Sequence, residues 1–277
     1  MNWTRIALFG VLISAISLVS LEMWLRFRPA QDPMVWVVSD DLGYYPAPNQ
    51  FSGNRQITEL SMRDGPFDGS SDNDTLILGD SIVFGRQYDH PTIPVWQIGA
   101  GGWSLLNLLA WVDAHPDAVG RIEHFIVILN ARDFGPLTPW PGDAIKPTGP
   151  PISYAWRFIV WNWHARIAWR LRSDDMAPDG NWRDPLREFC GRRHVTFVML
   201  PYRSELGAGW DEIFADRRGD LAEQCPQSEI IDVAQVEGWS RNIYNDHVHP
   251  VEERWIPIVR DVIDGGVSIP EGETGGG

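Results

Sequence analysis

This sequence of 277 residues has little positive charge and almost no cysteine. Its 23 Lys and Arg residues are outnumbered by 37 Asp and Glu residues, which gives a net charge of −14. Because nucleic-acid binding needs clustered basic side chains, this imbalance excludes a nucleic-acid partner. The sequence has no internal repeat, which excludes a repeat architecture. Roughly 240 residues follow an apolar N-terminal segment, enough for one large domain with its own core.

The two cysteines are Cys190 and Cys225. Each ends a predicted helix just before a predicted strand, at 195–200 and at 229–233. In a parallel sheet these positions lie at the same edge on neighbouring elements, so a disulfide is possible and would fit an oxidising compartment. Two unrelated buried thiols fit the pattern equally well.

The N-terminus carries a long apolar run from Ile6 to Trp24. Its 19 residues span about 28 Å as a helix, enough to cross the hydrocarbon core of a bilayer. A cleaved signal peptide is the alternative, but no Ala-x-Ala-like site follows, so we expect an uncleaved anchor over residues 1–28. The flanking arginines are balanced and leave the orientation open. We expect the rest of the chain to lie outside the cytoplasm, in the periplasm or at the cell surface.

After the anchor, residues 29–70 are rich in Pro, Gly, Asn and Asp and are predicted to be irregular, with room for a strand or hairpin. From residue 71, apolar runs alternate with helical patterns. Strands are predicted at 76–78, 95–98, 125–129, 195–200 and 229–233, and helices at 105–114, 183–190, 211–224 and 251–264. This alternation predicts a three-layer α/β/α sandwich with a mostly parallel five-stranded, flavodoxin-like sheet over 71–265. The tail, 266–277, is predicted to be disordered.

An aromatic and basic insertion at 134–172 interrupts this alternation. Residues 134–149 are expected to form a loop, and residues 154–172 fit a helix with four arginines. Apolar residues at helical spacing form a stripe along it: Trp156, Ile159, Val160, Trp163, Ile167 and Leu171. The helix could lie against the membrane beside the anchor. A lid or packing helix over the sheet is the interpretation that the sequence favours.

A candidate nucleophile follows the first strand of the predicted sheet, in the motif Gly79-Asp80-Ser81. Ligands of parallel α/β sheets bind beyond the carboxyl ends of the strands, where Ser81 falls. The residues after Ser81 can begin a helix, so its backbone N–H would lie where a developing oxyanion is stabilised. Gly-Asp-Ser is also an ordinary strand-to-helix turn, since Asp and Ser both cap helices well.

A second motif, Asp246-His247-Val248-His249-Pro250, lies near the C-terminus. A serine hydroxyl needs a base to take its proton, and the base needs a carboxylate to fix its tautomer. Asp246 and His249 can supply both, and His249 is preferred to His247 because it directly precedes Pro250 and the closing helix. A surface loop with two ordinary histidines is one alternative. A metal site at Asp246, His247 and His249 is another, but no second ligand cluster accompanies it.

The order and spacing of these motifs on an α/β sheet resemble the GDSL/SGNH hydrolase family, whose four blocks contribute Ser, Gly, Asn and His. Gly79-Asp80-Ser81 resembles the first block, with Ser81 as nucleophile. Residues 97–104 resemble the second block, with Gly102 as the glycine of the oxyanion hole. Asp246 and His249 resemble the last block.

The third block departs from the family pattern Gly-x-Asn-Asp, because the sequence here is Asn130-Ala131-Arg132-Asp133. Either Asn130 donates a hydrogen bond from a shifted position or Arg132 replaces the amide donor. The resemblance covers residues 76–264. Residues 40–49 also look like the lead-in of membrane-anchored bacterial members, some of which are associated with modifying cell-surface polysaccharides.

The resemblance implies a serine esterase or O-acyltransferase that needs no cofactor and no metal. It implies a triad of Ser81, His249 and Asp246, with an oxyanion hole from Ser81, Gly102 and Asn130 or Arg132. Three partners are expected. They are the membrane, which the N-terminal helix contacts, a substrate that is an acylated glycan or lipid, and a membrane acyltransferase. An acetyl ester is the first candidate for the substrate. The alternative is a catalytically impaired binding or assembly protein of the cell envelope that keeps the fold, and Arg132 is its best support.

Overall fold

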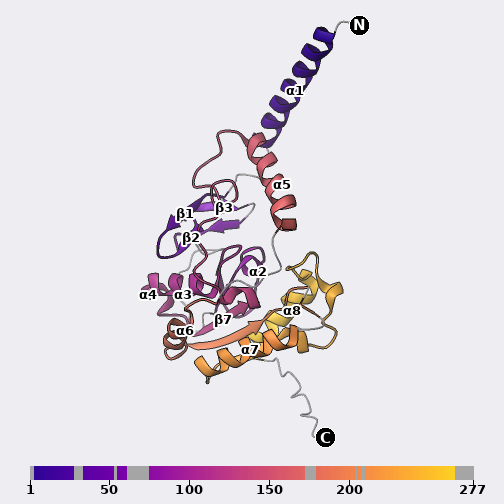
Figure 1. Cartoon of the computed structure of the whole chain (residues 1–277). Helices are drawn as coiled ribbons and strands as arrows, with labels where there is room; N and C mark the ends of the chain where they lie inside the picture. Colours follow the sequence, from indigo (N-terminus) through magenta and orange to yellow (C-terminus); the bar gives the residue numbers. More distant parts are fainter. Residues whose placement is uncertain are drawn as a thin grey trace. The chain divides into compact units, whose positions relative to one another are not determined.

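The computed structural model describes residues 3–27, 34–52, 55–60, 75–171, 179–203, 205–206 and 210–265 (Figure 1). The chain divides into two compact units. The first contains residues 1–39, 44–61 and 139–175, and the second contains residues 40–43, 62–138 and 176–277. The predicted disordered tail at 266–277 lies outside the described residues.

The second unit is built on five strands: β5 (Thr75–Gly79), β6 (Val95–Gly99), β7 (His124–Leu129), β8 (His194–Met199) and β9 (Glu229–Asp232). They pair in the order β6-β5-β7-β8-β9, and every pair is parallel. Most of their residues are buried, as expected of strands that are covered on both faces. The predicted five-stranded parallel sheet is therefore confirmed, and each strand begins and ends within one residue of its predicted bounds.

Helices cover both faces of this sheet. They are α2 (Ser81–Phe84), α3 (Leu105–Ala114), α4 (Pro116–Val119), α6 (Arg183–Cys190), α7 (Trp210–Gln224) and α8 (Glu252–Ile263), with 3-10 turns η2 (Ala131–Phe134), η3 (Val233–Gln235) and η4 (Arg241–Ile243). On one face, Ile126 of β7 shares a buried cluster with Val83 of α2 and Trp255 of α8. On the other face, Phe125 meets Phe189 of α6 edge-on, with ring centroids 5.1 Å apart.

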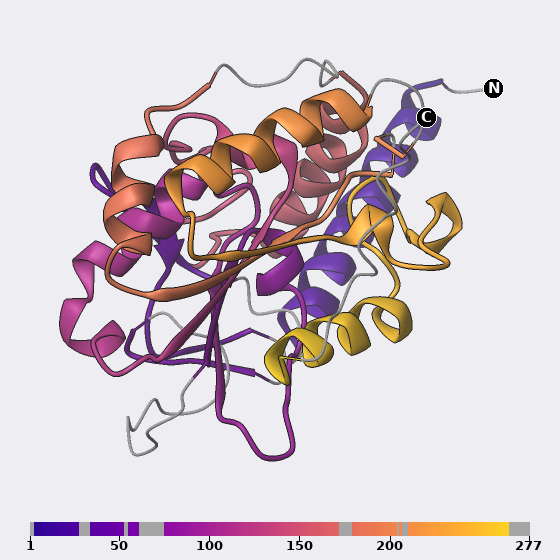
Figure 2. The ribbon, with the colours of Figure 1, turned by 90° about the horizontal axis from the view of Figure 1, so that it is seen from below.

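Neighbouring residues of β7 thus reach opposite layers, because successive side chains of a strand point to opposite faces. Figure 2 shows α8 (yellow) on one side of the sheet and α7 (orange) on the other. The predicted α/β/α sandwich is confirmed.

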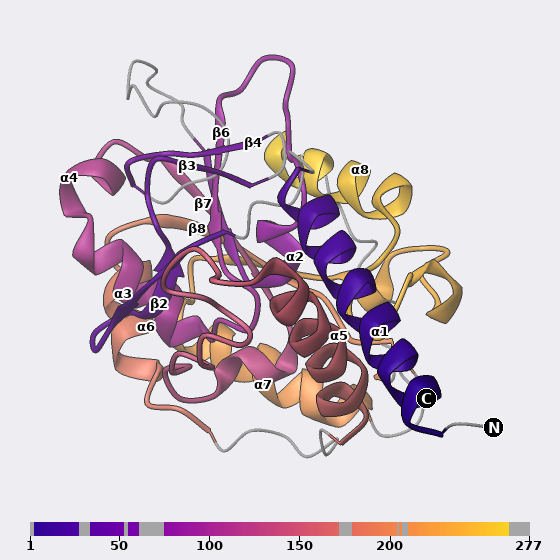
Figure 3. The ribbon, with the colours of Figure 1, turned by 90° about the horizontal axis from the view of Figure 1, so that it is seen from above.

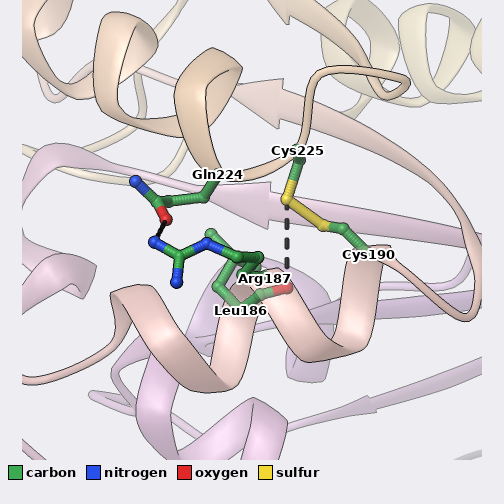
Figure 4. The surroundings of a disulfide bond; sticks show 5 residues. All are labelled: Leu186, Arg187, Cys190, Gln224 and Cys225. Carbon is green, nitrogen blue, oxygen red and sulfur yellow. Dashed lines mark hydrogen bonds between the residues drawn. A yellow bond between two sulfur atoms is a disulfide. The ribbon is translucent and has the colours of Figure 1, made fainter.

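Cys190, the last residue of α6, forms a disulfide with Cys225, the residue after α7 (Figure 4). Their Cα atoms lie 5.5 Å apart. Beside the bond, the Arg187 guanidinium donates to the Gln224 side-chain carbonyl, which also joins α6 to α7. Of the two alternatives that the sequence left open, the structure has the disulfide.

The first unit contains two helices and short strands: α1 (Trp3–Arg26), β1 (Trp36–Ser39), β2 (Gly43–Pro46), β3 (Gln50–Ser52), β4 (Arg55–Ile57) and α5 (Tyr154–Leu171). The boundary between the units falls just inside β2, whose first residue, Gly43, belongs to the second unit. The chain's single lysine, Lys146, is 7% exposed here. Its Nζ lies 3.9 Å from the ring centroid of Trp36 and 4.2 Å from that of Tyr44. The ring faces attract the buried cation, which helps to join the loop before α5 to β1 and β2.

Helix α1 is apolar and exposed along nearly all of its length. Among the described residues, it is the one helix that is long and apolar enough to cross a membrane. It could be a membrane anchor or a signal sequence. Helix α5 matches the helix predicted in the insertion. The side chains of Ile167, Leu171, Arg166 and Arg170, and all of Arg172, lie outside what the structure describes.

Candidate active site

Ser81 lies where the order of the sheet reverses. The strand before it, β5, has β6 on one side and β7 on the other, and ligands of such sheets bind beyond the carboxyl ends of the strands at this point. Ser81 is the first residue of α2. Asp80 caps this helix, because its Oδ1 accepts a hydrogen bond from the Ile82 N–H at 2.9 Å.

Buried polar contacts brace the short helix α2. The Tyr88 hydroxyl donates to the Ile82 carbonyl oxygen at 2.9 Å and accepts from the Trp255 indole N–H at 2.7 Å. Arg86, which is 6% exposed, donates to the carbonyl oxygen of Pro250. Since Pro250 directly follows His249, Arg86 ties the segment after Ser81 to the loop of the second motif.

That loop, residues 244–250, is closed by its own backbone and by Asp246. Tyr244 and Pro250 form an antiparallel bridge at its base. Asp246 Oδ1 accepts from the backbone N–H groups of Val248 and His249, both at 2.7 Å. Val248 is 7% exposed and packs in the core. These contacts fix the direction in which the His249 ring extends from the loop.

The His249 ring bridges Asp246 and Ser81. Its Nδ1 lies 2.8 Å from Asp246 Oδ2, and its Nε2 lies 3.0 Å from Ser81 Oγ. A second acceptor, Asp80 Oδ2, lies 3.4 Å from the same Ser81 Oγ, so the histidine is the closer partner. If Nδ1–H donates to the carboxylate, Nε2 is left to accept the serine proton. His247, the other histidine of the motif, is exposed.

Asp246 is held as a carboxylate. Partial burial raises its pKa, but the hydrogen bonds from the His249 N–H, the Val248 N–H and the His249 ring outweigh this effect. The pKa of Asp246 therefore lies below its ordinary value. An ionised carboxylate can fix the tautomer of His249 and stabilise a positive charge on its ring.

Gly102 lies in the turn that follows β6. Gly79 of β5 is in register with Gly99 of β6, so the segments after both strands leave the sheet at one level. The Trp103 N–H donates to the Ala100 carbonyl oxygen at 3.0 Å, and inside this turn Gly102 has a φ of 85°. This left-handed conformation favours glycine. Its oxyanion role remains a prediction.

The third block forms a cap on η2. Asn130 is 1% exposed, and its Oδ1 accepts from the Arg132 N–H at 2.9 Å. The Asn130 side-chain and backbone N–H groups both donate to Asp133 Oδ2, at 2.8 and 2.9 Å. This reciprocal arrangement is a capping box. Arg132 is half-buried, with its guanidinium carbon 4.9 Å from the ring centroid of Tyr202. The oxyanion roles of Asn130 and Arg132 remain predictions.

Sequence reasoning missed Tyr202 and Glu205, which follow β8 at the same edge of the sheet. The Tyr202 backbone N–H donates to the Glu205 carboxylate. Burial raises the pKa of Glu205 to about 8, although this hydrogen bond and the charge of Arg132 act to lower it. Their position just beyond a parallel strand is the signal that could have identified them.

Around Arg132, burial and neighbouring acidic groups raise the pKa values of Asp133 and Tyr202. Burial and the charge of Asp80 raise the pKa of Asp133 well above its ordinary value, against its two hydrogen bonds from Asn130. Burial, followed by the charges of Asp133 and Asp80, likewise raises the pKa of Tyr202. Arg132 lowers the pKa values of Tyr202 and Glu205. It therefore supplies positive charge where acidic groups converge.

The arrangement can move a proton and activate a hydroxyl. Among the described residues, no group of three or more His, Cys, Asp and Glu residues could hold a metal ion. Asp246, His247 and His249 thus form no such group. The predicted Ser81, His249 and Asp246 lie together, and their catalytic roles remain predictions.

No protein-family model and no curated protein matches this chain. Solved structures that it is similar to include the lipase Lip_vut3 from a goat rumen metagenome, with 12% identity and a TM-score of 0.41 over 70% of this chain and 97% of the other. TesA has 12% identity and a TM-score of 0.39 over 70% and 97%. A lipolytic G-D-S-L family protein from Veillonella parvula has 12% identity and a TM-score of 0.36 over 68% and 96%.

Proposed function

We propose that this protein is a serine esterase or O-acyltransferase that acts on an ester of a cell-envelope glycan or lipid. An acetyl ester is the first candidate for its substrate. The observation that carries the proposal is the bridging His249 ring, 3.0 Å from Ser81 Oγ and 2.8 Å from Asp246 Oδ2. A protein that only binds a ligand does not need a hydroxyl, an imidazole and a carboxylate aligned in this way.

In the first step, Ser81 Oγ attacks the carbonyl carbon of the ester while His249 Nε2 takes the hydroxyl proton. Asp246 holds Nδ1–H and stabilises the positive charge on the ring. The tetrahedral intermediate collapses, the bond to the alcohol breaks, and His249 gives its proton to the departing oxygen. Ser81 is left carrying the acyl group.

In the second step, water or an acceptor hydroxyl attacks the acyl-serine. His249 takes the proton of the attacking oxygen, and Ser81 Oγ regains a proton from His249 when it leaves. Water gives hydrolysis and an acceptor hydroxyl gives transfer, with the same three residues in the same roles. The choice depends on which nucleophile reaches the acyl group.

Negative charge develops on the carbonyl oxygen in both steps. The backbone N–H groups of Ser81 and Gly102 are the proposed donors, because they belong to the segments that follow two paired strands in register. We assign the third contact to Arg132 rather than Asn130. The Asn130 side chain already takes part in the cap of η2, whereas Arg132 is half-buried and positively charged.

We propose that the protein acts outside the cytoplasm, attached to the membrane through α1. The Cys190–Cys225 disulfide supports an oxidising compartment, since such bonds are rare in reducing cytosol. The apolar helix α1 is long enough to be the anchor. A membrane acyltransferase that delivers acyl groups to Ser81 is a partner consistent with this location.

The test is hydrolysis of p-nitrophenyl acetate by the full chain in detergent. Ser81→Ala and His249→Ala should each remove the serine-dependent rate. His247→Ala is the matched control, because it changes an exposed imidazole two residues away in the same loop and should keep the rate. Loss with all three variants, or with none, would contradict the assignment. A folded wild-type protein without activity on any acetyl ester would favour a binding or assembly role.

A further inference from the structure

The first half of α5 exposes large apolar side chains. The side chains of Trp156, Phe158, Ile159, Trp161 and Trp163 are 67%, 43%, 42%, 47% and 65% exposed. Ile152, just before the helix, is 97% exposed. So many exposed large apolar side chains within one short stretch are unusual on a protein surface that faces water. It indicates that something apolar covers this helix.

These side chains are not confined to one stripe. Successive helical residues are rotated by about 100°. Trp156, Ile159 and Trp163 therefore lie on one side of α5, and Phe158 and Trp161 lie on the opposite side. A packing helix or a flat protein partner would cover one side only. Lipid surrounds a helix, so it can cover both.

The start of α5 is fastened to the end of α1. The Glu22 carboxylate accepts from the Ser153 hydroxyl and from the Ala155 N–H, both at 2.8 Å. Arg26 donates to the Ile152 carbonyl oxygen at 2.8 Å, and its guanidinium carbon lies 5.1 Å from the Tyr154 ring centroid. A carboxylate that accepts from the first N–H groups of a helix is favoured there.

These contacts put α5 beside the C-terminal end of the apolar helix α1, and it does not continue the axis of α1 (Figures 1 and 3). If α1 crosses a bilayer, its last turn lies at the membrane–water boundary, and α5 begins at that level. Trp24 and Phe27 at this end of α1 are 51% and 76% exposed. Tryptophan is enriched at this boundary because its ring is apolar and its N–H is polar.

We propose that α5 is a second membrane-contacting element, whose first half, residues 154–163, is immersed in the boundary between lipid headgroups and acyl chains. The occupant of its exposed apolar surface is lipid, on the side of the bilayer where α1 ends. The apolar surface of α5 then continues that of α1. Glu22 and Arg26 set the level at which it enters. This inference is independent of any catalytic role of Ser81.

The experiment uses the full chain in phosphatidylcholine vesicles, with single cysteines that carry an environment-sensitive fluorophore. Trp161→Cys and Trp163→Cys sample opposite sides of α5. Leu18→Cys in α1 is the membrane control, and the same labelled proteins in vesicles without nitroxide lipid are the unquenched control. The native cysteines are both in the disulfide and do not react with the label. Quenching by lipids that carry a nitroxide reports contact with the bilayer.

The proposal predicts strong quenching at positions 161, 163 and 18. Quenching at 18 alone, or on one side of α5 alone, would overturn it. Protection of the α5 cysteines in native membranes that disappears in pure lipid vesicles would also overturn it and would indicate a protein partner. Trp156→Cys and Phe158→Cys repeat the test on the same two sides if a variant fails to fold.

Discussion

Replacing Asp246 by asparagine should slow the reaction strongly while leaving the loop intact. Asparagine keeps an oxygen that can accept the two backbone N–H groups of Val248 and His249, which Asp246 Oδ1 accepts at 2.7 Å. Its amide N–H₂ then faces His249 Nδ1 and can only donate. The ring must carry its proton on Nε2, so it can no longer accept the proton of Ser81.

The magnitude follows from this reversed tautomer. An Asp-to-Asn change of this kind costs on the order of 10⁴-fold in kcat in a buried serine-protease triad. The Asp246 side chain is 54% exposed, and water partly screens its effect on His249. We therefore expect a loss of about 10³-fold, which corresponds to about 4 kcal/mol in the activation free energy.

The assay is the single-turnover rate of acylation by p-nitrophenyl acetate, with urea unfolding of the same samples. Asp246→Ala is the matched control, because it removes the backbone hydrogen bonds as well. It should lose similar activity and, in addition, about 1–2 kcal/mol of the free energy of unfolding. Activity of Asp246→Asn within a few-fold of wild type would refute the reasoning. Destabilisation as large as that of the alanine variant would show that the loop, not the tautomer, was changed.

Three further predictions concern other parts of the second unit. Arg132→Ala should lower kcat about 100-fold, because it removes an oxyanion contact. Arg132→Asn supplies an amide donor at the same position and should retain more activity. Equal losses of kcat in the two variants would contradict the assignment. Burial raises the pKa of Glu205 to about 8. Between about pH 5 and 8 the folded state therefore binds more protons than the unfolded state. The free energy of unfolding then falls as pH rises, by about 1.4 kcal/mol per pH unit at most. Glu205→Gln should flatten this slope in urea titrations at several pH values, and an unchanged slope would contradict the buried acid. Replacing both Cys190 and Cys225 by serine should lower the free energy of unfolding by about 3–4 kcal/mol, because the two cysteines lie 35 positions apart and the cross-link closes a loop of that length. Unchanged urea midpoints would show that the cross-link contributes little.

The sheet could be predicted from the sequence because its strands are covered on both faces. Such strands are continuous apolar runs, and β7, whose residues 125–129 are all large and apolar, is the clearest. The sheet edge that carries Ser81 follows from the parallel order of the strands. The pairing of Ser81 with His249 could be inferred from the base that a serine nucleophile requires and from the family resemblance, but not from spacing, since the two residues lie 168 positions apart in the chain.

Other features depend on distances that the sequence does not contain. A disulfide and two separate thiols fitted the spacing of Cys190 and Cys225 equally well. The choice between them depends on the distance between the ends of two helices. Asn130 could cap a turn or donate to a substrate, and the Asn-x-x-Asp spacing alone cannot decide between these roles. The stripe on α5 was visible, but the exposure of Phe158 and Trp161 on the opposite side became apparent only in the structure.

The most direct test of the central claim is covalent labelling of the full chain by a fluorophosphonate, with the modified residue located by mass spectrometry. We predict one adduct, on Ser81, and no labelling of Ser81→Ala. His249→Ala should slow the labelling at least as much as Asp246→Asn does. His247→Ala should leave the labelling rate unchanged. An adduct on another residue, or no adduct on a protein whose unfolding transition is intact, would contradict the proposal that Ser81 is an activated nucleophile.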